Sequence, residues 1–342
     1  MNSSASVTKH SPKWDATPTL SVRGMDVYYE VSRGLFRKPS RLRAISGVTI
    51  DIAPGETLGL VGESGSGKTT VGRAILRRIP GTTGEIHLCG TDISRLEGEA
   101  LRAVRTKMQL VLQDPYTSLN PRMTIQDIVA EPLIVHGLAR STADARDEVR
   151  SLLKLVGLPE DAYRRFPHSF SGGQRQRVGI ARALALKPAL VVADEPVSAL
   201  DVSVRAQVVN LMQDLQRQRG LSYLFIAHDL SIVRHISHRV AIMYSGRIVE
   251  IASRDDIYDK PSHPYTQALL SAVPVANPKV ERTRKRQILP GETADIFNLP
   301  AGCAFQNRCA LASSRCREET PELRLIAGGG TGHQVACWNR GN

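Results

Sequence analysis

Short apolar runs alternate with amphipathic segments along most of the chain. Buried strands are predicted at residues 57–61, 189–193 and 222–227, where the runs are short and bounded by turn residues. Apolar residues recur at helical spacing over residues 68–78, 125–136, 142–156, 172–186 and 204–219. Strands that alternate with helices in this way are typical of a layered α/β fold.

Glycine and proline positions predict how these segments are joined. Pro54-Gly55 is expected to join VTIDI to ETLGLV as a hairpin, and Ser245-Gly246 is expected to turn a second hairpin within residues 240–250. Ser141 is a candidate cap for the helix over 142–156. Gly157 and Gly220 are placed to end helices.

Changes in polarity, periodicity and proline content divide the chain into three parts. Residues 1–19 are polar and predict a mobile tail. Residues 20–255 carry the alternating pattern, with a helical insertion at about 113–180. Residues 256–342 form a distinct extension that is rich in proline and holds the basic run KVERTRKR at 279–286. That run fits either a contact with anionic lipid headgroups or a solvated linker.

Composition excludes several classes of protein. The chain has 342 residues, enough for about two domains. No apolar stretch approaches the ~18 residues that would span a membrane, and the N-terminus lacks the apolar core of a secretory signal. A cytosolic location is therefore expected. The net charge of +12 fits nucleic acid and an anionic membrane surface equally well, but aromatic residues at 5% are too few for a base-stacking platform.

The segment Gly62–Thr69 (GESGSGKT) matches the phosphate-binding pattern G-x-x-x-x-G-K-[ST] in full. It follows a predicted strand and opens a predicted helix, which is the context this pattern requires. Glycines at 65 and 67 let successive backbone N–H groups turn toward phosphate oxygens. Lys68 would reach the β- and γ-phosphates, and the Thr69 hydroxyl would hold Mg²⁺.

Polar side chains stand at the carboxyl ends of three predicted strands. Asp194 and Glu195 end the run ALVVADEP, where Asp194 would hold Mg²⁺ and Glu195 would act as general base toward water. His228 follows YLFIA and could hold the γ-phosphate or the attacking water. Gln113 follows MQLVLQ, and its amide could reach Mg²⁺ and water. For His228 and for Gln113, each taken alone, the alternative is a purely structural role.

A second anion-binding helix start is predicted at SGGQRQR, residues 171–177. Ser171 and the amides of Gly172 and Gly173 would supply it. Because one chain does not need two such termini on one γ-phosphate, this second terminus is expected to act on a partner's nucleotide. A plain capped helix is the alternative.

Four of the five cysteines fall in the last 40 residues. Their spacing matches neither the paired pattern of structural zinc nor the common ferredoxin patterns. Four thiolates can hold Zn²⁺ or an iron–sulfur cluster, so both stay open. The quartet consists of Cys303, Cys309, Cys316 and Cys337, whereas Cys89 lies apart and is expected to be a buried or strand cysteine.

Six motifs in order resemble the ATP-binding subunits of ABC transporters: GESGSGKTT, the glutamine of VLQDP, FSGGQRQR, VVADEP, SALD and the histidine of IAHDL. QDPYTSLNPRMT and HPYTQALLSAVP further resemble the dipeptide, oligopeptide and nickel importers, most closely the second of their two paired ATPases. The likeness covers about residues 20–342. One departure is Phe170, where the broad superfamily usually has leucine.

The resemblance implies an ABC-type P-loop domain with a RecA-like core, an antiparallel β subdomain and a helical subdomain, and a loop-rich extension with a four-cysteine site. It implies ATP and Mg²⁺ as ligands and a [4Fe–4S] cluster on the cysteine quartet. Tyr29 would stack on adenine, with Tyr28 as the alternative. The nucleotide and Mg²⁺ would further contact Gly62, Glu63, Ser64, Gly65, Ser66, Gly67, Lys68, Thr69, Thr70, Gln113 and Asp194. Ser171, Gly172, Gly173, Gln174 and Asp201 would act on the ATP of the partner.

The resemblance also implies the partners. These are two membrane-spanning permease subunits, a second and paralogous ATP-binding subunit, and indirectly an extracytoplasmic binding protein, with no nucleic acid. The chain would lie peripherally on the cytoplasmic face of the membrane and hydrolyse ATP to drive import. The cargo stays open between dipeptides, longer peptides and nickel, as does the choice of homodimer or heterodimer. A soluble ABC-type ATPase acting on nucleic acid or ribosomes is the alternative.

Overall fold

The structure of the chain is a computed structural model that describes residues 16–31, 40–274, 289–291, 299–326, 330 and 332–340. Most of the predicted tail and the basic run at 279–286 lie outside these residues. The last part of the predicted tail is packed: Thr19 is buried, and its Oγ1 accepts a hydrogen bond from Ser222 Oγ at 3.0 Å.

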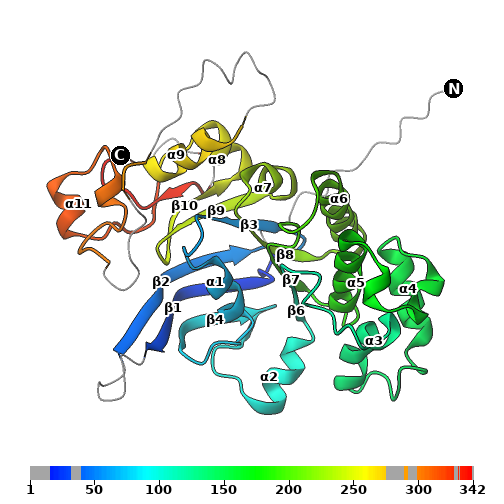
Figure 1. Cartoon of the computed structure of the whole chain (residues 1–342). Helices are drawn as coiled ribbons and strands as arrows, with labels where there is room; N and C mark the ends of the chain where they lie inside the picture. The colour runs from blue at the N-terminus through cyan, green and yellow to red at the C-terminus, as the bar shows by residue number, and fades with distance from the viewer. Residues whose placement is uncertain are drawn as a thin grey trace.

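A central sheet of eight strands runs in the order β11-β12-β10-β9-β3-β8-β7-β6 (Figure 1). The parallel strands are β3 (Thr57–Val61), β6 (Met108–Val111), β7 (Leu190–Asp194), β8 (Ser222–Ala227) and β9 (Arg239–Tyr244). The antiparallel edge is made by β10 (Arg247–Ser253), β11 (Arg324–Leu325) and β12 (Gln334–Val335). The predicted buried strands are confirmed, and β9 and β10 form the predicted hairpin at Ser245-Gly246.

A second, antiparallel sheet has four strands in the order β2-β1-β4-β5. Its strands are β1 (Leu20–Val31), β2 (Ser40–Ile52), β4 (Thr82–Leu88) and β5 (Thr91–Asp92). The hairpin predicted at Pro54-Gly55 is wrong, because β2 pairs with β1 in this sheet whereas β3 pairs with β8 and β9 in the central one. The turn therefore carries the chain from one sheet to the other.

The helix α1 (Lys68–Ile75) lies between the two sheets. Val71, Ala74 and Ile75 are fully buried in the core that the two sheets share. Gly72 lets the helix approach the central sheet closely, since a Cβ there would lie 2.9 Å from side-chain atoms of Ile226 and Val192. This packing fixes the start of α1, and with it the phosphate-binding loop.

Helices gather at one side of the molecule between β6 and β7, as predicted for the helical insertion (Figure 1). They are α3 (Ile125–Val135), α4 (Arg146–Leu155), the short helices η1 (Glu160–Arg164) and η2 (Pro167–Ser169), and α5 (Gly172–Leu184). Helix α4 begins four residues later than predicted, because residues from Ser141 onward form a turn in which the Ser141 hydroxyl accepts from the Asp144 N–H at 3.2 Å. Gly157 follows α4 at φ 72°, as predicted.

The remaining helices flank the central sheet and the extension. They are α2 (Gly98–Arg105), α6 (Val202–Arg219), α7 (Leu230–Ile236), α8 (Arg254–Asp259), α9 (Pro264–Ala272), η4 (Gln306–Arg308) and α11 (Ser314–Glu318). Gly220 ends α6 in the left-handed conformation, as predicted.

The extension is joined to the central sheet through its last strands. β12 pairs with β10, with Val335 opposite Glu250. The buried Glu250 carboxylate accepts bonds from the backbone N–H groups of Ser262 and His263 and lies 2.7 Å from His333 Nε2. This network ties β10, α9 and the end of the chain together. Cys89 departs from expectation, because it is exposed at φ 49° in the turn after β4.

Candidate functional site

The loop between β3 and α1 curls around the ammonium group of Lys68. Lys68 Nζ donates to the carbonyl oxygens of Gly62 at 2.9 Å and of Glu63 at 2.8 Å. Gly65 at φ 79° and Gly67 at φ 101° supply the left-handed turns that this path requires. Burial lowers the pKa of Lys68, and nearby carboxylates, chiefly Glu195, oppose that shift. The loop thus presents a buried cation and the N-terminus of α1 to one point, an arrangement that binds anions.

Thr69 and Asp194 meet beside this loop. The Thr69 hydroxyl donates to Asp194 Oδ1 at 2.9 Å. Burial raises the pKa of Asp194, and the bond from Thr69 opposes the shift. A hydroxyl and a carboxylate oxygen at one point are ligands that Mg²⁺ accepts together with phosphate oxygens and water. The pair therefore fits the predicted Mg²⁺ site.

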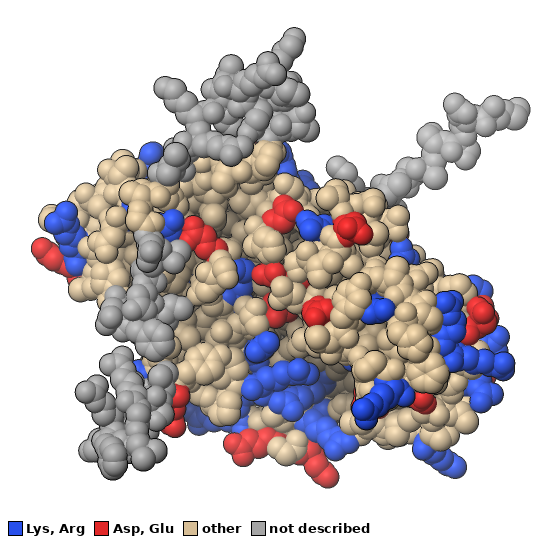
Figure 2. All heavy atoms as spheres, viewed as in Figure 1, with Lys and Arg blue, Asp and Glu red and all other residues tan. Residues whose placement is uncertain are grey.

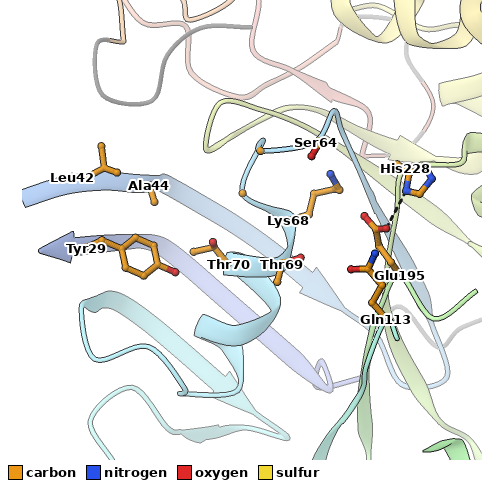
Figure 3. A pocket seen from close by; sticks show the side chains of 12 residues that line it. Tyr29, Leu42, Ala44, Ser64, Lys68, Thr69, Thr70, Gln113, Glu195 and His228 are labelled. Carbon is orange, nitrogen blue, oxygen red and sulfur yellow. Dashed lines mark hydrogen bonds and ion pairs between the residues drawn. The ribbon is translucent and has the colours of Figure 1, made fainter. Parts of the chain in front are cut away.

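Glu195 and His228 face each other at the ends of β7 and β8 (Figure 3). His228 Nδ1 lies 3.1 Å from Glu195 Oε2. The Glu195 side chain is 17% exposed and the His228 side chain 58%, so the histidine forms the outer rim. Glu195 is held at φ 48° while its N–H donates to Ile226 O at 2.9 Å. The arrangement places a carboxylate and an imidazole where both can reach the same water.

Lys68, Thr69, Glu195 and His228 open into one cavity of about 690 Å³. Among the described residues, the predicted contacts Gly62, Glu63, Ser66 and Asp194 do not line it. It is lined by Tyr29, Leu42, Ala44, Ser64, Gly65, Gly67, Lys68, Thr69, Thr70, Gln113, Glu195 and His228. The structure thus brings most of the predicted nucleotide residues together. Tyr29 lies in the cavity, whereas Arg41 stacks over the Tyr28 ring at 5.3 Å. Leu42 and Ala44 were not predicted, because nothing in their local sequence marks them as lining a site.

The residues predicted to act on a partner lie elsewhere. Ser171 caps α5, accepting from the Gln174 N–H at 3.3 Å, and Gln174 Oε1 accepts from the Ser171 N–H at 3.0 Å. Asp201 stands at the start of α6 without a side-chain capping bond. Within the described residues, neither these three nor Gly172 and Gly173 line the cavity of their own chain. Ser171, Gln174 and Asp201 are exposed, so they are free to meet another molecule.

The four cysteines of the quartet lie near one another in the extension. Burial raises the pKa of Cys303 to about 11, a backbone hydrogen bond from Phe305 opposes this, and the other three cysteines add to it. Burial also raises the pKa of Cys309 and of Cys337, with backbone hydrogen bonds from Leu311 and from Asn339 opposing. The Cys303 N–H donates to Cys316 O at 2.8 Å.

This arrangement does not support the predicted four-cysteine metal centre. In the part of the chain that the structure describes, no group of three or more His, Cys, Asp or Glu residues is placed to hold a metal ion. The Cys316 sulfur instead has Ser313 Oγ at 3.3 Å and Asn339 Nδ2 at 3.7 Å. These two contacts involve one residue nearby in the sequence and one 23 residues away.

Comparison with known proteins now identifies the family. Residues 45–198 match the ABC transporter family, and residues 249–316 match the family described as oligopeptide/dipeptide transporter, C-terminal region. The oligopeptide transport ATP-binding protein OppF of Salmonella typhimurium is 47% identical over 93% of this chain and 95% of its own length. The oligopeptide transport ATP-binding protein AppF of Bacillus subtilis is 49% identical over 93% of this chain and 96% of its own length. The chain belongs to the ATP-binding subunits of the oligopeptide ABC importers.

A solved structure supports the fold of this importer ATP-binding subunit. It is a dimeric post-hydrolysis state of the ATP-binding cassette MJ0796 bound to ADP and Pi, which is 28% identical to this chain. The likeness has a TM-score of 0.60 and covers 69% of this chain and 98% of the other. The predicted ABC ATPase fold is therefore confirmed. Among the described residues, every helix is too short or too polar to cross a membrane.

Proposed function

We propose that this protein binds and hydrolyses ATP to drive the import of peptides through a membrane ABC transporter. The observation that carries the proposal is the single cavity in which Lys68, Thr69, Glu195, His228 and Gln113 meet. The names of its relatives, which are 47–49% identical and described as oligopeptide transport ATP-binding proteins, support peptides as the cargo. We assign ATP hydrolysis to residues 20–255, and we assign residues 256–342 to a C-terminal extension of the oligopeptide-importer type.

The phosphate-binding loop would exchange its internal bonds for bonds to ATP. Lys68 Nζ now donates to two loop carbonyls, and these donors would turn to the β- and γ-phosphate oxygens. Thr69 and Asp194 would hold Mg²⁺, and Gln113 lines the same cavity as Thr69. When bound, Mg²⁺ neutralises charge that develops on the phosphate oxygens. Tyr29 is 39% exposed at the rim, which leaves its ring accessible to adenine.

Glu195 is placed to take the proton of the attacking water. As the water oxygen bonds to the γ-phosphorus, the bond from that phosphorus to the bridging oxygen breaks, and ADP and phosphate leave. The Glu195 carboxylate accepts the proton that the water loses. His228, 3.1 Å away, orients the carboxylate and the water.

Two ATP-binding subunits would complete each other's sites. Ser171, Gln174 and Asp201 are exposed and lie outside the cavity of their own chain. Ser171 caps the start of α5. The backbone N–H groups of this helix start would contact the γ-phosphate bound by the partner. We propose a paralogous subunit as the partner, and a peripheral position for both on the cytoplasmic face of the membrane.

A groove between the central sheet and the helical insertion fits the permease subunits. It has a volume of about 380 Å³, and its basic side chains include Arg78, Arg105 and Arg182, with Leu110 and Val135 among its apolar ones. Figure 2 shows basic side chains gathered in this hollow. Burial lowers the pKa of Arg78, and the neighbouring Arg105 lowers it further. Glu131 also lines the groove and interacts with Arg182, so Arg78 and Arg105 are the cations that would favour a membrane-subunit segment carrying a carboxylate.

We also propose that the cysteine quartet holds a metal cluster in the assembled protein. What supports this is the donor set: four sulfurs in one segment, with backbone N–H groups of Phe305, Leu311 and Asn339 directed at three of them. Such N–H groups stabilise thiolates, and thiols with raised pKa values need a metal to lose their protons near neutrality. Iron and acid-labile sulfide, measured on anaerobically purified protein, test this. Equimolar zinc without iron would contradict a [4Fe–4S] cluster.

The test of the function is Glu195→Gln in the full chain. We expect this variant to bind ATP like the wild type but to hydrolyse it at least ~100-fold more slowly, since the amide accepts no proton. Tagged variant protein, loaded with ATP, should co-purify two permease subunits and a second ATP-binding subunit from detergent-solubilised membranes.

The control is Lys68→Ala, which should bind ATP poorly and capture no second ATP-binding subunit. Hydrolysis by Glu195→Gln at the wild-type rate would remove Glu195 from the role of base. Capture of ribosomes or nucleic acid in place of permeases would replace the transport assignment with the soluble alternative.

A further inference from the structure

We propose that the C-terminal extension is a structural part of the ATP site, through Arg308 and Tyr265. Both contact Glu63, the second residue of the phosphate-binding loop. In this proposal they are positioning residues that hold the loop in the shape that accepts phosphates. The inference rests on the proposed function, because it concerns the affinity of that same site for ATP.

Glu63 makes contacts in three directions. Its carboxylate faces Arg308 in a two-pronged ion pair, with Arg308 Nη1 to Oε2 at 2.9 Å and Nη2 to Oε1 at 3.4 Å. Its N–H donates to the Tyr265 hydroxyl at 3.0 Å. Its carbonyl accepts from Lys68 Nζ at 2.8 Å. The residue that holds the catalytic lysine is therefore itself held by two side chains from outside the loop.

Arg308 is itself firmly held. Its side chain is only 10% exposed, and it also hydrogen-bonds the Tyr244 hydroxyl. Desolvation acts against the charge of Arg308, but the bonds to Glu63 and Tyr244 outweigh it and raise the pKa. A charge this buried is costly unless it stays paired, so the contact with Glu63 resists opening.

Aromatic packing fixes both contacts to the body of the protein. Phe305, only 1% exposed, lies 5.2 Å from the Tyr244 ring and 5.5 Å from the Tyr265 ring. Tyr244 and Tyr265 are 4.7 Å apart, edge to face. Phe305 and Arg308 both lie in the short stretch between Cys303 and Cys309. The segment that contacts the phosphate-binding loop through Arg308 therefore lies between the first two cysteines of the quartet.

The contacts of Arg308 and Tyr265 with Glu63 should affect the binding of ATP and not the chemical step. Among the described residues, neither Arg308 nor Tyr265 lines the cavity, and the contact between Glu195 and His228 involves neither of them. These two residues fix the position of the Glu63 backbone. They thereby fix the Glu63 carbonyl oxygen, whose hydrogen bond from Lys68 must break when a phosphate binds. Loosening this backbone allows the empty loop more conformations, which ATP must then restrict on binding.

A double-mutant cycle tests the proposal in the full chain. Glu63→Gln, Arg308→Gln and the double variant are made in the Glu195→Gln background, and the Kd for ATP is measured by calorimetry. We expect each single change to raise Kd about tenfold and the double change to raise it by about the same factor, because contacting partners are not additive. Arg308→Lys should restore part of the affinity, since lysine keeps the charge but not the two-pronged geometry.

Turnover separates this role from a merely structural one. In the wild-type background, Arg308→Gln and Tyr265→Phe should raise KM while kcat changes by less than about twofold. The matched control is Arg315→Gln, which removes the same charge from an exposed ion pair with Glu319 elsewhere in the extension. It should bind ATP like the unsubstituted chain.

The possible results distinguish a failure of the proposed function from a failure of the positioning role. If the unsubstituted chain fails to bind ATP, the proposed function is wrong. If it binds ATP and the Glu63 and Arg308 variants bind equally well, or if their effects multiply in the double variant, the positioning role is overturned. Should Arg308→Gln fail to fold, as judged by thermal unfolding, Arg308→Lys and Tyr265→Phe carry the same decision.

Discussion

Glu195 has a backbone conformation that L-amino acids rarely adopt, with φ at 48°. Its N–H is bonded to Ile226 O on the neighbouring strand, so the sheet holds the residue in this conformation. The turn points the carboxylate away from β7 and toward His228 and the cavity. Strain of this kind is often found where function needs a fixed side chain. The strand end therefore gives up stability to orient the side chain that we propose as general base.

This strain predicts an unusual order of stability among inactive variants. At φ 48° an alanine keeps the steric penalty that glycine lacks, so Glu195→Gly should be more stable than Glu195→Ala by about 1 kcal/mol. Chemical denaturation of both variants measures the difference. The comparison pair is Gln207→Gly and Gln207→Ala on the exposed face of α6, where glycine should be the less stable by about 1 kcal/mol. The same order at both positions would show that the Glu195 backbone is unstrained.

The positions of the site residues were predictable wherever they depended on a short, contiguous pattern. The phosphate-binding loop, Asp194 and Glu195 at a strand end, and His228 after the next buried strand were all readable from sequence. The pairing of Glu63 with Arg308 was not, because 245 residues separate them. The exposure of Cys89 was also missed, since the strand pattern that ends at Leu88 does not show that a turn begins at the next residue.

At the scale of elements, the contact between α5 and α6 depends on one glycine. A Cβ on Gly173 would lie 2.3 Å from Val204 Cγ1, closer than atoms can pack. The start of α5 can therefore approach α6 only because residue 173 has no side chain. This close crossing sets the direction in which the N–H groups after Ser171 point.

We expect Gly173→Ala to lower the free energy of unfolding by about 1–3 kcal/mol, the usual cost of overpacking. Thermal or denaturant unfolding measures it. Gly179→Ala in the same helix is the matched control, since a Cβ there meets nothing within 4 Å. That variant should be neutral or more stable, by up to about 1 kcal/mol. Adding Val204→Ala to Gly173→Ala should recover part of the loss, and equal stability of the two alanine variants would contradict the close-packing argument.

Helices and buried strands were predicted well because their apolar periodicity is local. The strand at 222–227 has the predicted bounds, and α6 ends at Gly220 as expected. The hairpin at Pro54-Gly55 failed because a turn signal does not tell which sheet the next strand enters. Helix α4 was predicted too long, since Ser141 caps a turn rather than the helix itself. Sheet membership and exact starts depend on tertiary pairing, which one sequence does not contain.

At the scale of the whole molecule, the last part of the chain packs against the central sheet and contacts the phosphate-binding loop. β12, near the end of the chain, pairs with β10, and the extension reaches back to the phosphate-binding loop through Arg308. At the other edge of this sheet, β6 lies beside the helical insertion (Figure 1), and the groove there is lined by Leu110 of β6 and Val135 of α3. The cavity of the phosphate-binding loop thus lies between a contact made by the extension and the groove that we propose for the permeases.

The basic groove gives the last prediction, which concerns assembly. Arg78→Glu should weaken capture of the permease subunits about tenfold, because it replaces a crowded cation with a charge that repels a carboxylate-bearing segment. Pull-down from solubilised membranes measures the capture, and ATP hydrolysis by the isolated subunit should stay within about twofold of wild type, because Arg78 does not line the ATP cavity. Arg219→Glu, at the exposed end of α6, makes the same charge change outside the groove and should capture the permeases normally. Equal capture by the two variants would place the permease contact on another face, whereas a loss restricted to Arg78→Glu would connect this groove to transport.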